Sequence, residues 1–199
     1  MTICAIDTET TGLDMVSHIV ELCIVPTKVE KGELVQDTSK VPFNILVNPG
    51  ELELHQGKDA LAFNKIGSEV IIKEGVPSKQ VLPMLKGWMM ANGIKKIVPL
   101  AHNWVFDSKM LEILFSRKEM DNVFNHRGLD TMFIATFYNF VNNMMFKKDV
   151  FKSCGLTKLC EHWQIDTEGA HRALNDCLMT IKVFNQFQLT LKSLYEEIK

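Results

Sequence analysis

Three apolar, strand-like segments follow one another near the start of the chain, before any clear helical pattern begins. They cover residues 3–7, 18–25 and 41–47, and the last one ends at an N-P-G turn. Short links between consecutive strands favour a meander, in which neighbouring strands pair with each other. Because a sheet must bury at least one face, the rest of the chain must supply covering layers.

Helical patterns supply those layers. We expect helices at residues 59–65, 77–93, 104–116, 131–145, 156–163 and 172–194, with one further strand at 96–100. Strands followed by helices that alternate with another strand predict an α/β fold, a mixed β-sheet flanked by α-helices. Neither an internal repeat nor a low-complexity linker divides the chain, so we expect one domain over residues 1–199.

Composition limits the possible classes of protein. With 46% hydrophobic and 23% charged residues, the 199-residue chain is suited to one globular core. The sequence has no apolar run long enough to span a membrane and does not start like a leader peptide, so we expect a cytoplasmic protein without membrane association.

The five cysteines form no C-x-x-C pair and are expected to be reduced core residues. The spacing of Cys154, Cys160 and His162 matches no common zinc pattern. The net charge of -2 argues against a broad basic surface for nucleic acid, although bound divalent cations can supply a positive field.

Two acidic residues end the first strand, in the stretch A-I-D-T-E-T-T-G. Asp7 and Glu9 are two positions apart, so both side chains leave the same face of the strand. A third acid, Asp107, lies in A-H-N-W-V-F-D, one turn after the N-cap candidate Asn103 and just beyond the strand at 96–100.

The last acidic position is in A-H-R-A-L-N-D. His171 and Asp176 are five positions apart, so they do not share a helix face. We expect His171 on the loop before the last helix and Asp176 in the first turns of that helix. Each acid has a simpler interpretation in isolation, because acids are common at turns and helix starts, and a lone histidine is usually a polar loop residue.

Taken together, the four acids point to metal binding. Ligands of α/β sheets gather at the carboxyl ends of the strands, where these acids are expected. Four unpaired carboxylates at one edge would repel one another unless hard divalent cations lay between them. We therefore predict a metal site built from Asp7, Glu9, Asp107 and Asp176.

The three motifs, in this order, resemble those of the DEDDh (DnaQ-like) 3'-5' exonuclease superfamily, which includes the proofreading subunits of bacterial replicative DNA polymerases, RNase T and oligoribonuclease. The resemblance implies a ribonuclease H-like sheet, and release of nucleoside 5'-monophosphates from 3' ends with two Mg²⁺ or Mn²⁺ ions. It also implies that Asp7, Glu9, Asp107 and Asp176 are metal ligands and that His171 is the general base. A histidine can accept the proton of an attacking water at neutral pH.

The resemblance also suggests which residues contact the substrate. Thr10, Thr11 and Leu13 would line the terminal nucleotide, with Leu13 as an apolar wedge and Thr10 near the 3'-hydroxyl, although plain turn chemistry explains the threonines equally well. His102 and Asn103 are candidates for the wall of the groove. We expect Asp130 to be an N-cap, and Trp104, Phe106 and Trp163 to pack in the core.

Three functions remain open at this level. The closeness of D-T-E-T-T-G to the proofreading motif favours an exonuclease acting on single-stranded DNA ends, either on its own or in association with a DNA polymerase. The nearest rival is an exoribonuclease that trims short RNA, and the third is a non-catalytic binding module, which has no need for intact acids and histidine. Residues 54–67 differ from the H-x-I-T stretch of many relatives, with His55 as a loose counterpart, so the choice between DNA and RNA stays open. The sequence does not indicate an oligomeric state.

Overall fold

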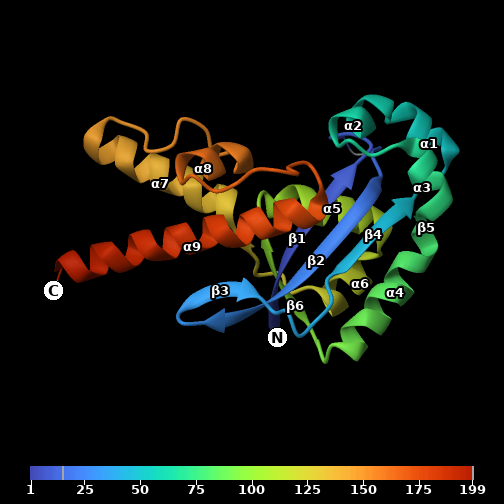
Figure 1. Cartoon of the computed structure of the whole chain (residues 1–199), viewed down its shortest axis with the longest axis horizontal. Coiled ribbons are helices and arrows are strands. Elements are labelled where there is room, and N and C mark those ends of the chain that lie inside the picture. Colours follow the sequence, from blue (N-terminus) through green and yellow to red (C-terminus); the bar gives the residue numbers. More distant parts are fainter. Residues whose placement is uncertain (15, 199) are drawn as a thin grey trace.

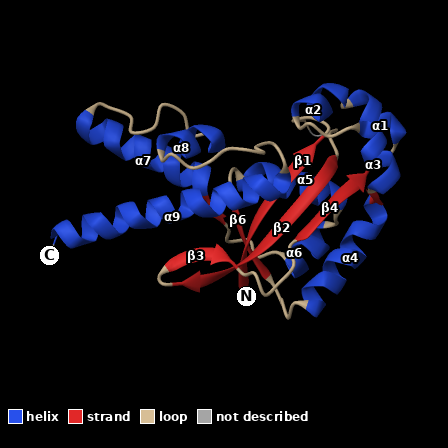
Figure 2. Cartoon of the chain, in the orientation of Figure 1, coloured by secondary structure: helices blue, strands red, loops and turns tan. Residues whose placement is uncertain are grey.

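A mixed β-sheet forms the centre of the molecule (Figures 1 and 2). The computed structural model describes residues 1–14 and 16–198. The sheet has the order β5-β4-β2-β1-β6-β7, and β3 pairs with β2 off this path. The strands are β1 (Thr2–Thr10), β2 (Ile19–Glu30), β3 (Glu33–Gln36), β4 (Phe43–Asn48), β5 (Val76–Pro77), β6 (Ile97–Ala101) and β7 (Leu129–Asp130). The predicted α/β class is confirmed.

The strand pairing brings three carboxyl ends to one edge of the sheet. β1 pairs with β2, and β2 with β4, in antiparallel fashion, as the predicted meander requires. β6 lies parallel to β1, with Ala5 opposite Leu100, and β7 lies parallel to β6. The segments that follow β1, β6 and β7 therefore emerge side by side.

A hairpin between β2 and β3 was not predicted. Glu30 pairs with Glu33, so the loop contains only Lys31 and Gly32, and both have positive φ angles of 53° and 87°. Two positive φ angles are characteristic of a type I′ turn, whose twist matches that of the flanking strands. The hairpin continues β2 beyond residue 25, where the predicted strand ended.

Helices cover both faces of the sheet. On one face lie α4 (Ser78–Ala91), α5 (Trp104–Leu114) and α6 (Arg117–Val123), and the other face is covered by the long helix α9 (Ala173–Ile198) (Figure 1). In the first layer, Ile6 and Leu22 of the sheet pack with Leu85 and Leu111 of the helices. In the second layer, Ala5 and Cys23 pack against Cys177 of α9.

The remaining helices form two groups at the periphery. The short helices α1 (Glu51–Gln56), α2 (Lys58–Phe63) and α3 (Ser68–Glu74) pack on Val20 of β2 through Leu54, Leu61 and Ile71. α7 (Thr131–Phe146) and α8 (Leu156–His162) pack against α9 around Phe187 and Leu159. Of these, α2, α7 and α8 match predicted helices, whereas α1 and α3 were not predicted, nor was α6. A helix of six or seven residues spans so few turns that its periodic pattern is weak.

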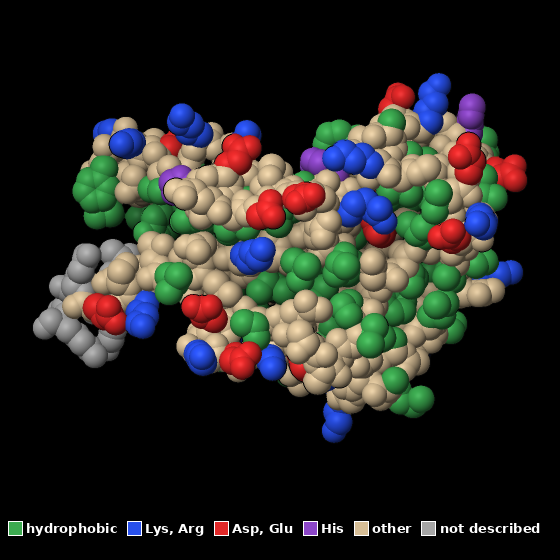
Figure 3. All heavy atoms as spheres, in the orientation of Figure 1, with side chains coloured by type: hydrophobic (Ala, Val, Ile, Leu, Met, Phe, Trp, Pro, Cys, Tyr) green, Lys and Arg blue, Asp and Glu red, His purple; other side chains and the backbone are tan. Residues whose placement is uncertain are grey.

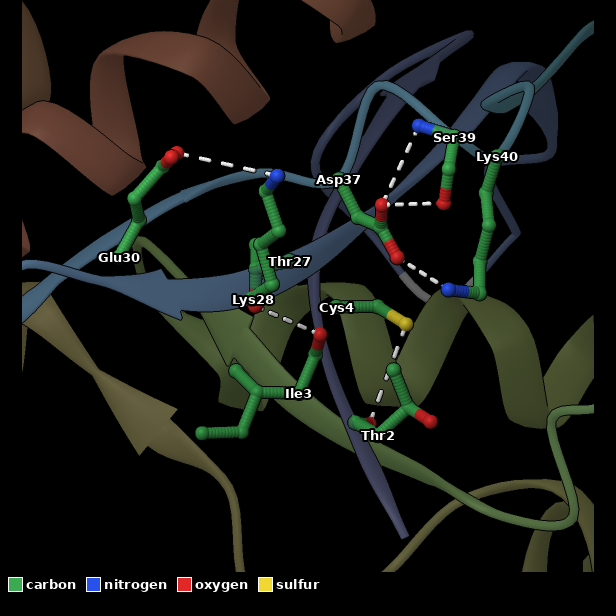
Figure 4. Close-up of polar contacts among 9 residues, drawn as sticks. All are labelled: Thr2, Ile3, Cys4, Thr27, Lys28, Glu30, Asp37, Ser39 and Lys40. Atoms are coloured by element: carbon green, nitrogen blue, oxygen red, sulfur yellow. Dashed lines mark hydrogen bonds and ion pairs between the residues drawn. The ribbon is translucent and has the colours of Figure 1, made fainter.

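Polar contacts fix the start of β1 and the loop after β3 (Figure 4). Asp37 accepts hydrogen bonds from the backbone and side chain of Ser39 and pairs with Lys40. The Thr27 hydroxyl donates to the Ile3 carbonyl at 2.8 Å, which joins β2 to β1. The Thr27–Ile3 bond supports the β1–β2 pair at the end of β1 away from Asp7 and Glu9, whereas the Asp37 contacts fix the loop after β3.

Several smaller expectations can be checked against this fold. Among the described residues, none of the helices combines the length and hydropathy that a membrane span requires. Trp104 and Phe106 pack against the core beneath α5, and the Trp163 ring lies 5.0 Å from that of Phe187, so the predicted core role of these aromatic residues is confirmed. Cysteines 4, 23, 160 and 177 are buried, and Cys154 is half-buried.

Candidate active site

The alternation of side chains along β1 directs its polar residues to two faces. Ala5 faces α9 and Ile6 faces α4 and α5, so Asp7 and Glu9 continue the α9 face while Thr8 points to the α5 side. The strand itself is apolar and buried up to this point. The sequence therefore places two carboxylates at the end of a rigid strand, both on the side that α9 covers.

A third carboxylate comes from the start of α9. Asp176 lies in the first turn of this helix, and carboxylate oxygens of Asp7, Glu9 and Asp176 all lie within 4.8 Å of one another. Glu9 is buried, whereas Asp7 and Asp176 are half-buried and so remain accessible from solvent. The predicted convergence of these three residues is what the structure shows.

Asp107 reaches the same region from the opposite layer. It is in the first turns of α5, is 3% exposed, and accepts a hydrogen bond of 2.7 Å from the Thr8 hydroxyl. Its negative charge is, after burial, the main reason why the pKa of Asp7 is raised. Through its contact with Thr8, which lies between Asp7 and Glu9 on β1, Asp107 reaches the same edge of the sheet. It is not part of the group of three acids whose oxygens lie within 4.8 Å of one another.

Burial raises the pKa values of all four acids, and repulsion between their negative charges raises those of Asp7 and Glu9 further. Burial, with the charge of Asp176 next in size, raises the pKa of Glu9 to about 8, and burial raises that of Asp107 to about 7. The pKa values of Asp7 and Asp176 are also raised, again chiefly by burial. Carboxylate oxygens at this spacing are the ligands that Mg²⁺ and Mn²⁺ prefer, so the residues present fit hard divalent cations.

These shifts predict that metal-free protein is less stable at higher pH. An unfolded carboxyl group loses its proton near pH 4, whereas Glu9 and Asp107 keep theirs in the folded state up to about pH 8 and 7. The folded state therefore binds more protons in this window, and its stability falls as pH rises through it. Melting temperatures in EDTA should drop between about pH 5 and pH 8, and Mn²⁺ should restore most of the loss by binding the folded state. A melting temperature in EDTA that does not fall over this interval would contradict the account.

His171 lies on the loop before α9, as predicted, and two contacts orient it. Its backbone has a positive φ of 67°, and its N–H donates to the Asp176 carboxylate at 3.1 Å. Its ring packs against that of Phe63 from α2, with 4.4 Å between the ring centroids. The imidazole thus stands next to the carboxylate cluster, with an exposed phenylalanine at its side.

The α1–α2 corner lies directly over the T-T-G turn that follows Glu9. Gly57 approaches Thr11 so closely that an added Cβ would lie 2.4 Å from the Thr11 Cβ, and the Asn64 side chain donates to the Thr10 carbonyl at 3.3 Å. This corner is the segment at residues 54–67 that departs from the pattern of many relatives. It places Phe63 against His171, so it borders one side of the carboxylate cluster.

The candidate substrate residues differ in accessibility. The Thr10 hydroxyl donates to the Gly12 carbonyl, and the Thr11 hydroxyl accepts from the His18 N–H, which is the turn chemistry that the sequence left open. Leu13 is 88% exposed beside this turn, so it is free to contact a ligand. Contact of these residues with a terminal nucleotide stays a prediction.

The other two candidates follow β6. Asn103 precedes α5 with a positive φ of 73°, but its side chain forms no cap there, contrary to expectation. Instead, the Asp130 carboxylate accepts from the N–H groups of Asn103 and Trp104, and it also caps α7 as predicted. The His102 ring bonds the Thr131 hydroxyl at 2.9 Å, and burial lowers the pKa of His102 to about 4.

Sequence reasoning missed an ion pair, between buried Glu21 and partly exposed Arg172, that fixes the His171 loop. Glu21 of β2 pairs with Glu9 across the strands and is almost fully buried. Its carboxylate accepts two hydrogen bonds from the Arg172 guanidinium, at 3.0 and 2.9 Å, and one from the Ala173 N–H. The ion pair neutralises the charge of Glu21, the fifth acid in this region. Because Arg172 and Ala173 both donate to Glu21, the start of α9 is bound to β2. An arginine next to the motif histidine was the available signal, but its partner is far away in the sequence.

A mixed sheet with a carboxylate cluster and a histidine at its carboxyl edge is suited to metal-dependent hydrolysis of phosphodiesters, the reaction of nucleases. The RNase_T exonuclease family model matches residues 4–184, and the chain belongs to this family. It is a 3'-5' exonuclease hydrolase by this membership, and the family uses divalent metal ions. The DEDDh resemblance inferred from the three motifs is thereby confirmed.

Comparisons with individual proteins agree with the family. The chain is 28% identical over 197 residues to Ribonuclease T of Actinobacillus pleuropneumoniae serotype 5b (strain L20), covering 95% of this chain and 84% of the relative. E. coli exonuclease I in complex with a dT13 oligonucleotide has a similar fold, with a TM-score of 0.72 and 17% identity over 98% of this chain. A second complex of that enzyme, with a 5cy-dT13 oligonucleotide, gives a TM-score of 0.64 at 15% identity over 92% of the chain. The chain spans 43% and 39% of those two exonuclease I chains.

Proposed function

We propose that this protein releases nucleoside 5'-monophosphates from the 3' ends of single-stranded DNA. The observation that carries the proposal is the convergence of Asp7, Glu9 and Asp176 at one edge of the sheet, with Asp107 and His171 next to this group. Two Mg²⁺ or Mn²⁺ ions held by these carboxylates would supply Lewis-acid chemistry for an in-line displacement at the terminal phosphodiester.

The chain's own residues divide the remaining work. His171 takes the proton from the attacking water, and its place on a loop rather than in α9 leaves the ring free to adjust over a bound end. Phe63 limits the movement of that ring, and its exposed face offers a surface on which a terminal base can stack. Leu13 provides an apolar contact across the same opening.

The fit to single strands has a physical reason. The α1–α2 corner packs on the T-T-G turn through Gly57, so the protein borders the end of β1 on that side, and a single strand needs less space there than a duplex. Similarity to an exonuclease I that was crystallised with an oligothymidylate supports DNA as the substrate. RNA is the second candidate, because the sequence is similar to a Ribonuclease T over nearly its whole length.

Degradation of matched, 5'-labelled DNA and RNA oligomers of the same sequence tests the choice. With Mn²⁺ present, we expect both to shorten from the 3' end in single-nucleotide steps, with the DNA oligomer degraded faster. Blocking the terminal 3'-hydroxyl as a phosphate should protect the oligomer if the 3' end is the point of attack. Faster degradation of RNA would assign the protein to the trimming of RNA, and cleavage inside the strand would contradict the exonuclease proposal itself.

A further inference from the structure

The backbone of His171 has a conformation that the surrounding structure has to maintain. Its φ angle of 67° lies in the left-handed region, which residues other than glycine rarely adopt. Such a conformation persists only where neighbouring contacts hold it. The contacts of the residues before and after His171 therefore show what fixes the imidazole beside the carboxylate cluster.

Two short-range hydrogen bonds close the loop on itself. The Asn175 side chain donates to the Gly169 carbonyl at 2.9 Å, and Gly169 also has a positive φ, of 77°. The Asp176 carboxylate accepts from the His171 N–H at 3.1 Å. These bonds join residues of the loop to the first turn of α9, so by themselves they do not attach the loop to the sheet that carries Asp7.

The attachment to the sheet comes from Glu21. Arg172 directly follows His171, and its Nε and Nη2 atoms donate to the two oxygens of the Glu21 carboxylate at 3.0 and 2.9 Å. The same carboxylate accepts from the Ala173 N–H at 3.2 Å. A guanidinium that binds both oxygens of a carboxylate fixes the direction of the side chain as well as its distance.

This anchor lies on the same face of the sheet as two of the acids. In the β1–β2 pair, Glu21 lies opposite Glu9, and Cys23 lies opposite Asp7. Cys23 faces α9, and side chains alternate along a strand, so Glu21 faces α9 as well. The position of the His171 backbone is therefore set relative to the two strands that hold Asp7 and Glu9.

Stability alone does not require an ion pair at this position. Desolvation of a buried charge offsets much of the attraction, so a pair with a buried partner adds little net stability. Apolar contacts already join α9 to the sheet through Ala173 and Cys177. Figure 3 shows basic, acidic and histidine side chains close together between α2 and the start of α9, and the Arg172 side chain is 43% exposed. The Arg172 end of the pair therefore lies at the open side of the site.

We propose that Arg172 and Glu21 are positioning residues that hold His171 in its left-handed conformation, so that the imidazole stays beside the carboxylate cluster. The inference rests on the proposed function, in which His171 accepts the proton of the attacking water. Arg172 acts through His171 and touches neither the water nor the substrate. The backbone is held from the α9 side, whereas the ring, which packs on Phe63, keeps its own side-chain rotations.

Steady-state kinetics on a 5'-labelled oligomer test this role. Arg172→Ala should lower kcat by about 10-fold to 10²-fold with KM and Mn²⁺ affinity nearly unchanged, because a small displacement of a catalytic group is costly. Glu21→Gln removes the charge of the anchor and leaves Arg172 in place, and it should also lower kcat and not raise KM. Arg172→Lys keeps the charge but cannot bind both oxygens in the same way, so it should recover only part of the lost kcat.

A double variant separates a positioning role from an independent one. In the His171→Ala background, Arg172→Ala should slow turnover by less than about 3-fold, since the group to be positioned is already absent. Losses that multiply in the double variant, or a raised KM with unchanged kcat in Arg172→Ala, would show that Arg172 acts on its own and would overturn the proposal. Arg117→Ala is the matched control, because the ion pair of Arg117 with Glu112 is exposed, and it should leave kcat unchanged.

Hydrogen–deuterium exchange supplies a readout that needs no activity. In substrate-free protein, amide exchange of peptides over residues 168–175 should be faster in Arg172→Ala and Glu21→Gln than in wild type and Arg117→Ala. Circular dichroism and the melting temperature establish that each variant is folded. Unchanged exchange in this segment would overturn the proposal whether or not the protein is active. Faster exchange in the two variants of a wild-type protein that does not degrade 3' ends would support the attachment of the loop and refute the proposed function instead.

Discussion

Replacing Asp7 by alanine should abolish metal-dependent hydrolysis while the protein stays folded. Asp7 is next to Asp107 and within reach of Glu9 and Asp176, so its removal opens the centre of the carboxylate cluster. Loss of a central ligand costs several kcal/mol of transition-state stabilisation, and we expect the rate to fall by about 10³-fold or more.

The stability of this variant distinguishes a catalytic from a structural role. The raised pKa of Asp7 means that its ionised form destabilises metal-free folded protein at neutral pH. Asp7→Ala should therefore melt at the same temperature as wild type or higher in EDTA, and should gain less from Mn²⁺. Asp121→Ala changes an exposed acid outside the cluster and serves as the control for both readouts. Full nuclease activity of Asp7→Ala would remove the carboxylate-metal account.

Replacing His171 by alanine should slow turnover by about 10²-fold at neutral pH, because the attacking water loses its proton acceptor. Metal binding should be nearly unchanged, since the four carboxylates remain and the Asp176 carboxylate accepts from the His171 backbone rather than its ring. Part of the lost rate should return as pH is raised, because hydroxide then replaces the missing base. Single-turnover rates over a pH series, with Mn²⁺ affinity measured by calorimetry, check both expectations.

His126→Ala is the matched control for this substitution, because His126 is exposed on the loop before β7 and takes no part in the cluster. A turnover rate of His171→Ala within a few-fold of this control would show that another group accepts the proton. Loss of Mn²⁺ binding together with activity would instead mean that His171 is a metal ligand. Both results are distinct from the expected one.

The main strands and the acidic edge could be predicted because their signals are local. Asp7 and Glu9 share a face by the two-residue period of a strand, and the apolar runs at β1, β2, β4 and β6 are long enough to read directly. The order of strands then follows from short connections and from the parallel pairing of β1 with β6. Local sequence patterns thus predict all four carboxylates at one edge of the sheet.

The contacts that complete the site depend on pairs that no local pattern links. Arg172 and Glu21 are 151 positions apart, and their ion pair exists only because α9 crosses β2. Phe63 lies at the end of α2, a short helix that the sequence predicts, but no local pattern indicates that its ring contacts His171. The local sequence favours Asn103 as the N-cap of α5. Instead, the Asp130 carboxylate of β7 accepts hydrogen bonds from backbone N–H groups at the starts of both α5 and α7. In each case the partner of the side chain is set by a tertiary contact, which the local sequence does not indicate.

The distribution of apolar side chains on α7 gives a similar lesson. Its sequence reads as a buried helix, because phenylalanine and methionine appear on nearly every side. In the fold of one chain, only part of the helix is covered. Sequence patterns indicate which surfaces avoid water, but they do not indicate whether the same chain or another one covers them.

The most direct test of the whole account is the anomalous scattering of crystals soaked with Mn²⁺ and a nucleoside 5'-monophosphate. Two anomalous peaks should appear about 4 Å apart, bounded by oxygens of Asp7, Glu9, Asp107 and Asp176, with the phosphate of the nucleotide between them and His171. Peaks elsewhere in the molecule, or a carboxylate cluster that stays free of Mn²⁺ while the nucleotide is bound, would contradict the central claim.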